Sequence, residues 1–402
     1  MLVVKKFGGS SVANSERILN VARRCIEEYV KGNDVVVVLS AMGDTTDDLL
    51  DLAAQITDKP SRRELDMLLS TGEQVSVALT AMAVSRMGVP VVSLNAFQVQ
   101  MHTNSQYGNA KLKKIDTKRI QYELENRKIV FVTGFQGVNK YDDVTTLGRG
   151  GSDTTAVALA AALKADICEI YTDVDGVYTC DPRIVPNAKK LNEITYDEMM
   201  DMATLGAQVL HNRSVGLAKK YGVKLVVRSS LSYEEGTVVK EVVKVESRLI
   251  SGVAIDKSPA RISLIGLHDV PGIAFKVFDL LSRANINKDI ILQSVGRDGT
   301  KDISFTVDKK DLEESIAILE ENLESLTADH IEHEENIAKV SVVGAGMMTD
   351  ATVAAKMFEA LYNADINIKM IATSEIRITV IVDADEAEHA AKVVHDAFIP
   401  EN

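Results

Sequence analysis

Short runs of apolar, mostly β-branched residues alternate with alanine- and leucine-rich stretches along roughly the first 230 residues of the chain. Apolar runs without polar alternation are typical of strands buried on both faces, whereas the alanine- and leucine-rich stretches are typical of helices. We therefore expect an α/β fold with three layers, in which helices cover both faces of a mainly parallel sheet and ligands bind at the carboxyl ends of the strands. The predicted strands are Leu2–Val4, Val35–Leu39, Val89–Ser93, Ile129–Thr133, Ile167–Tyr171 and Val223–Val227.

This alternation of strand and helix patterns ends between Ser229 and Ser258. Val, Lys and Glu alternate over Gly236–Ser247, and a strand-like run follows over Leu249–Ile255. We expect a first domain at 1–235 and a junction at 236–258, with a strand in the junction that joins the C-terminal region.

An internal repeat follows the junction, because the sequence from Arg261 to Ser294 resembles the sequence from Lys339 to Ser374. Both copies show a strand, a helix with one apolar stripe, a strand, a turn, a strand and another helix. We expect two ferredoxin-like β-α-β-β-α-β domains, at 259–335 and 336–402. Their polar residues are mostly surface Lys, Glu and Asp, which favours binding or pairing over catalysis.

Charge and composition argue against several classes of function. The net charge is −13 and no basic block is present, which disfavours binding to nucleic acid or to an anionic membrane. The longest apolar runs are far shorter than the roughly 20 residues that span a bilayer, and the chain opens without a signal-peptide pattern, so we expect a cytoplasmic protein without a membrane span. Cys25, Cys168 and Cys180 are too widely spaced for a disulfide framework or a zinc site. We expect no metal site from the histidines, and place His330 and His333 in a charged, solvated helical stretch.

The first candidate motif, Lys5-Lys6-Phe7-Gly8-Gly9-Ser10-Ser11, stands between the first strand and a helix that begins near Ser15. Glycines let the backbone approach phosphate oxygens, a helix N-terminus favours anions, and a lysine neutralises charge on a transferred phosphoryl group. The spacing is not that of a Walker motif. The alternative is a tight turn with surface lysines.

A second motif, Arg149-Gly150-Gly151-Ser152-Asp153, opens an alanine-rich helix. Its arginine, glycines and hydroxyl group at a helix start suit a carboxylate or a phosphate, and Asp153 would then orient a lysine or a phosphate-bound magnesium ion. Alternatively, Ser152 or Asp153 only caps the helix.

The third motif, Tyr171 to Arg183, is a loop rich in turn residues and oxygen ligands. The position of Gly176 excludes a calcium loop, which leaves a nucleotide-binding loop or a plain pair of turns at Asp175-Gly176 and Asp181-Pro182.

Two shorter segments, Ser40–Thr46 and Ser70–Gln74, complete the candidate set. Glu73 is suited to pair with a substrate ammonium group, but Ser70 and Glu73 also fit a capping box, and Thr46 also fits a helix N-cap.

Together, the motifs around Lys6, Ser40, Arg149 and Thr172, followed by the repeat, resemble the aspartokinase family over essentially the whole chain. The resemblance implies an amino-acid-kinase domain followed by two ACT domains. It implies transfer of the γ-phosphoryl group of ATP, with Mg²⁺, to the side chain of L-aspartate, and feedback inhibition by lysine, threonine or both. A glutamate kinase and a catalytically inactive amino-acid sensor are the alternatives.

By the same resemblance, Lys6 and Asp153 are the catalytic residues. L-aspartate would be bound by Ser40, Thr46, Glu73, Arg149, Gly150, Gly151 and Ser152. ATP would be bound by Lys6, Phe7, Gly8, Gly9, Thr172, Asp173, Tyr178, Asp181 and Arg183. An amino-acid effector would bind between paired ACT domains near Asp269, Asn287 and Gln293, in a homo-oligomer that is expected to be a dimer. For Asn287 and Gln293, ordinary strand-end polarity is the alternative.

The sequence departs from the family pattern at two places. Gln208 occupies a position where some members have lysine, which places more of the phosphate contact on Lys6. The turn Asp269-Val270-Pro271-Gly272 of the first repeat corresponds to Asp350-Ala351-Thr352-Val353 in the second, without Pro-Gly, which argues against effector binding by the second repeat.

Overall fold

The computed structural model describes residues 1–206, 209–242, 249–294, 299–348, 350 and 352–399. Gln208, Ala351 and the end of the Gly236–Ser247 alternation lie outside the described residues. By packing, the chain forms two units: Met1–Thr179 with Lys189–Val245, and Cys180–Ala188 with Glu246–Asn402.

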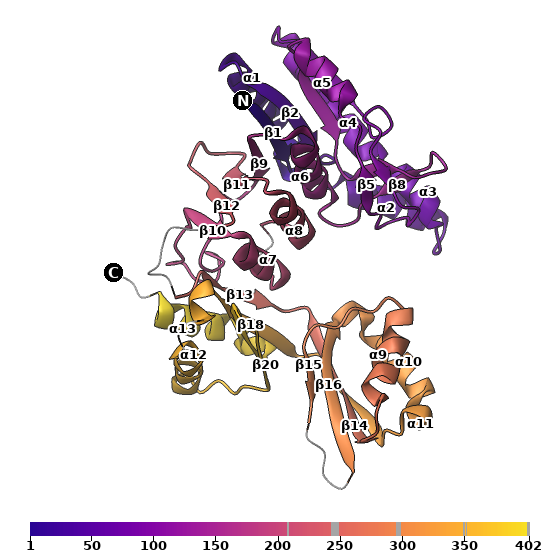
Figure 1. Ribbon diagram of the computed structural model, residues 1–402, viewed down its shortest axis with the longest axis vertical. Helices are drawn as coiled ribbons and strands as arrows, with labels where there is room; N and C mark the ends of the chain where they lie inside the picture. The colour runs from indigo at the N-terminus through magenta and orange to yellow at the C-terminus, as the bar shows by residue number, and fades with distance from the viewer. Residues whose placement is uncertain (207–208, 243–248, 295–298, 349, 351, 400–402) are drawn as a thin grey trace. The chain divides into compact units, whose positions relative to one another are not determined.

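An eight-stranded sheet forms the centre of the first unit, in the order β10-β12-β11-β9-β1-β2-β6-β3 (Figure 1). Adjacent strands are parallel except at the pair β11 and β12, which confirms the predicted mainly parallel α/β fold. Strands β1, β2 and β6 are almost wholly buried, as expected for a sheet covered on both faces. The bounds are β1 Leu2–Phe7, β2 Asp34–Leu39, β3 Val91–Leu94, β6 Ile129–Thr133, β9 Ile167–Thr172, β10 Glu193–Thr195, β11 Leu225–Ser229 and β12 Thr237–Lys240.

Helices cover both faces of this sheet. Helices α1 and α4 share a core with one face, and α6 packs on β1, β2 and β9 with α8 packed against it. The helices are η1 Gly9–Val12, α1 Ser15–Val30, α2 Thr45–Ile56, α3 Arg62–Leu69, α4 Thr71–Arg86, α5 Lys118–Glu125, α6 Gly151–Leu163, α7 Tyr196–Thr204 and α8 Asn212–Tyr221. A small second sheet has the order β5-β4-β7-β8, with bounds Leu112–Lys114, His102–Thr103, Gln136–Val138 and Val144–Thr146.

One stretch of the described residues, Arg62–Arg86, is long and apolar enough to cross a membrane by length and composition alone. Within it, α4 packs against α1, β3 and β6, and Val77, Ala81 and Val84 are part of the core. The apolar composition is therefore explained by packing inside the domain.

The second unit contains two four-stranded sheets, β15-β16-β14-β17 and β13-β18-β20-β19, each with helices on one face (Figure 1). The strands are β13 Gly252–Asp256, β14 Pro259–His268, β15 Ile291–Gln293, β16 Thr300–Asp308, β17 His330–Glu334, β18 Ile337–Val343, β19 Met370–Thr373 and β20 Arg377–Asp383. The helices are α9 Ile273–Arg283, η2 Lys309–Asp311, α10 Leu312–Glu321, α11 Leu323–Leu326, η3 Ala345–Met348, α12 Thr352–Asn363, η4 Ala384–Glu386 and α13 Ala387–Phe398.

Three details of this unit differ from the sequence pattern. The second sheet takes its fourth strand from β13, which precedes the whole first repeat and pairs with β18, so this copy is not one continuous β-α-β-β-α-β segment. The expected helix around His330 and His333 is wrong, because both lie on edge strand β17, where charged side chains suit an exposed edge. Segment Cys180–Ala188 packs into the core of the second sheet through Cys180 and Val185.

Candidate active site

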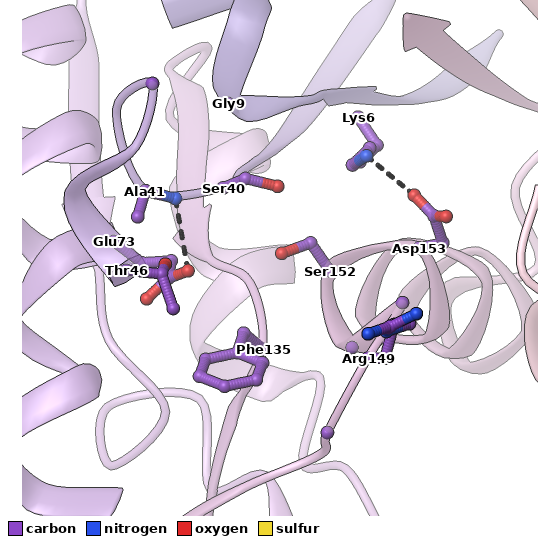
Figure 2. A pocket seen from close by; sticks show the side chains of 14 residues that line it. Lys6, Gly9, Ser40, Ala41, Thr46, Glu73, Phe135, Arg149, Ser152 and Asp153 are labelled. Atoms are coloured by element: carbon purple, nitrogen blue, oxygen red, sulfur yellow. Dashed lines mark hydrogen bonds and ion pairs between the residues drawn. The ribbon is translucent and has the colours of Figure 1, made fainter. Parts of the chain in front are cut away.

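A cavity of about 290 Å³ lies in the first unit, where β1, β2 and β6 end. Figure 2 shows side chains from both sides of it: Glu73 and Thr46 on one side, and Lys6, Asp153 and Arg149 on the other. The lining residues are Lys6, Gly9, Ser40, Ala41, Gly43, Thr46, Glu73, Phe135, Gly148, Arg149, Gly150, Gly151, Ser152 and Asp153. The structure therefore brings together both predicted catalytic residues and all predicted aspartate-binding residues.

Lys6 and Asp153 form an ion pair, with 2.7 Å between Lys6 Nζ and Asp153 Oδ1 (Figure 2). Each side chain is only 12% exposed, so Lys6 is not a surface lysine of a simple turn. Side chains alternate along β1, which directs Lys6 towards α6, the helix that carries Asp153. The pair places one cation and one carboxylate at the end of the strand where the cavity opens.

Lys5 lies on the opposite face of β1 and is 3% exposed. Its ammonium group contacts Glu169 on β9 at 2.6 Å and donates to the hydroxyl of Tyr171 at 3.1 Å. Burial alone would lower the pKa of Lys5, but Glu169 and Tyr171 together with Cys25 outweigh burial and the pKa is raised. The pKa of Glu169 is correspondingly lowered, because its cationic partners outweigh the effect of burial. This pair joins β1 to β9 directly behind Lys6.

Glu73 points into the cavity from the first turn of α4 and is 3% exposed. Its Oε1 accepts a hydrogen bond from the backbone N–H of Ala41 at 3.1 Å, whereas the buried Oε2 has no hydrogen-bond partner among the described residues. Burial raises the pKa of Glu73 to about 7. The capping-box alternative is wrong, since the hydroxyl of Ser70 donates to the carbonyl of Met67 and no side-chain cap is present. A buried, unpaired acceptor of this kind suits a cationic group of a ligand.

The turn from Leu147 to Gly151 presents Arg149 at the start of α6. Gly148 has φ +77° and Gly150 has φ +68°, a left-handed backbone that favours glycine on both sides of Arg149. Arg149 is exposed, and no hydrogen bond or ion pair joins its side chain to the rest of the described chain.

The cap alternatives at this turn and at α2 do not hold. The N-cap of α6 is Gly150, without a side-chain hydrogen bond, so Ser152 and Asp153 lie inside the first turn. Thr46 likewise lies within α2, whose N-cap is Asp44.

Phe135 lines the same cavity but was not predicted. It is a non-glycine residue with φ +68°, and its backbone N–H donates to the hydroxyl of Thr155 at 3.2 Å. Strained backbone of this kind persists where the surrounding structure fixes it, often at functional sites. The sequence signal is weak, because Gly134-Phe135 reads only as the end of a strand.

The predicted nucleotide-binding residues of the first motif differ in how close they lie to the cavity. Lys6 and Gly9 line the cavity, and a Cβ at Gly9 would lie 2.8 Å from the carbonyl of Ala41, which requires glycine there. The ring of Phe7 is fully buried and stacks on Tyr171 with 4.5 Å between centroids, and Phe7 does not line the cavity, so its contact with ATP stays a prediction. Gly8 donates its N–H to the carbonyl of Tyr171 at 3.2 Å.

The remaining nucleotide candidates begin at Thr172, the last residue of β9, and do not line the cavity. Thr172 donates to Asp173, and the hydroxyl of Tyr178 donates to Asp175, both at 2.8 Å. Asp181 and Arg183 form an ion pair at 2.6 Å within the second unit. These contacts join residues close in sequence, as is typical of tight turns. Nucleotide binding by this loop stays a prediction.

The predicted effector residues lie in the second unit. Asp269 is paired with Lys301 at 2.8 Å, before helix α9. Asn287 is exposed, and Gln293 is the exposed last residue of β15, an edge strand. All three residues are exposed, Asp269 after the inner strand β14 and Asn287 and Gln293 before and at the end of edge strand β15. Their role in effector binding stays a prediction.

Comparisons with known proteins agree with this architecture. Residues 1–229 match the model of the amino acid kinase family, and residues 262–323 and 340–398 match the ACT domain. An aspartokinase of Bacillus sp. strain MGA3 is 50% identical over 398 residues, covering 99% of this chain and 97% of its own length. The chain belongs to the aspartokinase family. It is accordingly an enzyme, an aspartate kinase.

Solved aspartokinases share the fold over the full length of the chain. Escherichia coli aspartokinase III in complex with aspartate and ADP is 27% identical and has a TM-score of 0.85, with 99% of both chains covered. The same enzyme in complex with lysine and aspartate has a TM-score of 0.76, with the same identity and coverage. The predicted amino-acid-kinase domain and ACT domains of this aspartokinase are therefore confirmed.

Proposed function

We propose that this aspartokinase transfers the γ-phosphoryl group of ATP to the side-chain carboxylate of L-aspartate, forming 4-phospho-L-aspartate, the first step towards lysine, threonine and methionine. The observation that carries the proposal is the cavity in which Lys6 and Asp153 stand opposite Glu73, with Arg149 at its edge. An amino acid with two carboxylates and one ammonium group has complementary partners there. The related enzyme from Escherichia coli, solved with aspartate and ADP, agrees with this assignment.

Charge complementarity suggests which residue of the cavity binds each charged group of L-aspartate. Arg149 is free to bind the α-carboxylate with two parallel hydrogen bonds, and the unpaired Oε2 of Glu73 accepts from the ammonium group. The hydroxyl groups of Ser40, Thr46 and Ser152 and the backbone at Gly150 and Gly151 line the space between. The side-chain carboxylate is then left facing Lys6.

The reaction needs no general base, because an aspartate carboxylate with an ordinary pKa near 3.9 is already ionised at neutral pH. Catalysis then consists of holding the two reactants in line and neutralising charge on the transferred group. Lys6 supplies the positive charge, and Asp153 orients the Lys6 ammonium group at 2.7 Å.

For the nucleotide, we assign the phosphates to Lys6 and to the backbone of Phe7, Gly8 and Gly9, and the remainder of ATP to Thr172, Asp173 and Tyr178. The role of Asp181 and Arg183, which belong to the second unit, stays a prediction from the sequence. The described residues contain no group of three side chains that could hold a metal ion by themselves. A site with few carboxylates suits Mg²⁺ that is bound to the ATP phosphates and has few protein ligands. Asp153, which pairs with Lys6, is the carboxylate that would contact it. Mg²⁺ would supply charge neutralisation on the phosphoryl oxygens.

Regulation is assigned to the second unit. We infer that lysine, threonine or both inhibit the enzyme by binding near Asp269, Asn287 and Gln293, in a homodimer that pairs through the ACT domains. Exposed Ile291 and Leu292 on edge strand β15 are consistent with pairing at that edge. The related Escherichia coli enzyme has been solved with lysine, which favours an amino-acid effector. We propose a cytoplasmic location, where aspartate, ATP, lysine and threonine are present.

The test is steady-state turnover with Mg-ATP and either L-aspartate or L-glutamate, titrated with lysine, threonine and both. We expect aspartate to be preferred by at least about tenfold in kcat/KM, because one extra methylene displaces the reacting carboxylate from Lys6. We expect inhibition by at least one of the two amino acids. Equal turnover of glutamate would overturn the substrate assignment, and full activity in both effectors would overturn the regulatory one.

Glu73 should impose a pH dependence on aspartate binding. Since burial raises the pKa of Glu73 to about 7, lowering the pH through that value protonates the carboxylate that pairs with the ammonium group. We expect kcat/KM for aspartate to fall about tenfold for each pH unit below about 7, while the KM for ATP changes little. In Glu73→Gln, kcat/KM should be low throughout and lose this acidic limb. An unchanged acidic limb in the variant would contradict the assignment.

A further inference from the structure

We propose that Arg213, at the N-terminus of α8, is a positioning residue for aspartate binding, because it fixes the turn that carries Arg149. The inference rests on the proposed function, in which Arg149 binds the α-carboxylate of aspartate. Arg213 does not line the cavity and acts through the backbone of the turn.

The guanidinium group of Arg213 donates hydrogen bonds to two backbone carbonyls. Its Nη1 donates to the carbonyl of Leu147 at 2.8 Å and its Nη2 donates to the carbonyl of Ala110 at 2.7 Å. Leu147 is the first residue of the Arg149 turn, and Ala110 lies on the neighbouring loop before β5. One planar guanidinium group therefore joins the turn to a segment distant in sequence, with a geometry that a lysine cannot reproduce.

A second contact from the same helix end reaches the turn. His211, the N-cap of α8, lies against Gly150 so closely that a Cβ on Gly150 would be 2.3 Å from the Cβ and the Cγ of His211. Because α8 also packs along α6, one helix contacts both the Arg149 turn and the helix that carries Asp153.

Asp66 on α3, which is 1% exposed, holds the residue that precedes the turn. Both of its oxygens accept from the N–H of Gly108 at 3.0 Å, and they also accept from the N–H and the hydroxyl of Thr146 at 2.9 and 2.7 Å. Asp66 thus fixes the residue before Leu147, and the loop that contains Ala110. Arg213 joins the same two segments through the carbonyls of Leu147 and Ala110.

This support matters because Arg149 has none of its own. Its side chain has no hydrogen-bond or ion-pair partner in the described chain, and it is flanked by Gly148 and Gly150, both with positive φ. Glycine on both sides gives the turn many accessible conformations, and only the fraction with Arg149 correctly placed can bind the carboxylate. Removing Arg213 should lower that fraction and so raise the apparent dissociation constant for aspartate.

The test compares Arg213→Met and Arg213→Lys with Arg24→Met as a matched control. Arg24 is 5% exposed and also donates to two backbone carbonyls, of Ser229 and Ser232, but at a site remote in sequence from the Arg149 turn. We expect Arg213→Met to raise the aspartate KM by about tenfold or more with the ATP KM nearly unchanged, and Arg213→Lys to give a smaller rise. Arg24→Met should leave the aspartate KM near that of the parent even where it lowers Tm.

Several outcomes would overturn the inference. An aspartate KM that stays within about twofold of the parent in Arg213→Lys and Arg213→Met would do so, as would equal rises in both substrates or an equal rise in Arg24→Met. If Arg213→Met fails to fold, Arg213→Lys gives the same comparison. A parent enzyme without aspartate turnover would refute the proposed function itself, whereas an active parent with unaffected variants would refute the role of Arg213 alone.

Discussion

Replacing Lys6 with methionine should reduce kcat by about a thousandfold, or about 4 kcal/mol in transition-state stabilisation, while the aspartate KM changes by only a few-fold. Lys6 is 12% exposed and lies at the cavity, where a cation is little screened by water. Its charge is needed mainly when charge shifts on the transferred phosphoryl group, so the loss appears in kcat. Steady-state kinetics with both substrates varied measures kcat and the aspartate KM separately. A fall in aspartate affinity alone would contradict this role for Lys6.

The neighbouring lysine provides the control for this experiment. Lys5→Met removes the same charge from the opposite face of β1 and leaves Glu169 buried without one of its cations. Breaking a buried pair in this way destabilises the fold by about 3 kcal/mol or more, so Tm should fall. The kcat per folded molecule should fall far less than in Lys6→Met, because Lys5 does not line the cavity.

Replacing Arg149 with methionine should raise the aspartate KM by about a hundredfold, or about 2.7 kcal/mol, with a smaller effect on kcat. The reason is the loss of two charge-assisted hydrogen bonds to the α-carboxylate, a group that does not react and is bound alike before and during the transfer. Because Arg149 is exposed and makes no ion pair within the described chain, Tm should stay near that of the parent.

Two further substitutions separate charge from geometry at this position. Arg149→Lys keeps the charge but loses the planar, two-pronged donor, and should give an intermediate aspartate KM. Arg86→Met removes an equally exposed arginine at the end of α4, outside the cavity, and should leave both KM values unchanged. A kcat loss in Arg149→Met with the aspartate KM unchanged would exclude the substrate-binding role.

Much of the site could be predicted from the sequence because its residues occur in short, glycine-rich motifs next to strand ends. Parallel strands bring their carboxyl ends to one edge of the sheet, so Lys6 after β1 and Arg149 before α6 meet although they are far apart in the chain. The sequence at Ser70 and Glu73 is equally compatible with a capping box, in which Glu73 would have only a structural role. The structure excludes the capping box, because the Ser70 hydroxyl donates to the carbonyl of Met67 and Glu73 accepts from the N–H of Ala41.

The supporting residues could not be predicted in the same way. Arg213 and Asp66 act through backbone carbonyls and N–H groups of segments distant in sequence, and His211 acts by packing against Gly150. Contacts of these kinds leave no local motif. Phe135 was missed because its positive φ is imposed by the surrounding fold and is not a preference of phenylalanine.

The topology of the repeat was only partly predictable for a related reason. A strand-like run at β13 is visible in the sequence, but its partner β18 follows the entire first repeat, and pairing over such a distance is not encoded locally.

Steady-state kinetics of Lys6→Met and Arg149→Met, measured side by side with aspartate and Mg-ATP both varied, would show whether one cavity holds the aspartate backbone groups through Arg149 and meets the transferred phosphoryl group through Lys6. The predicted result is a kcat loss confined mainly to Lys6→Met and an aspartate KM rise confined mainly to Arg149→Met. Loss of the same kinetic parameter by the same factor in both variants, at unchanged Tm, would contradict it.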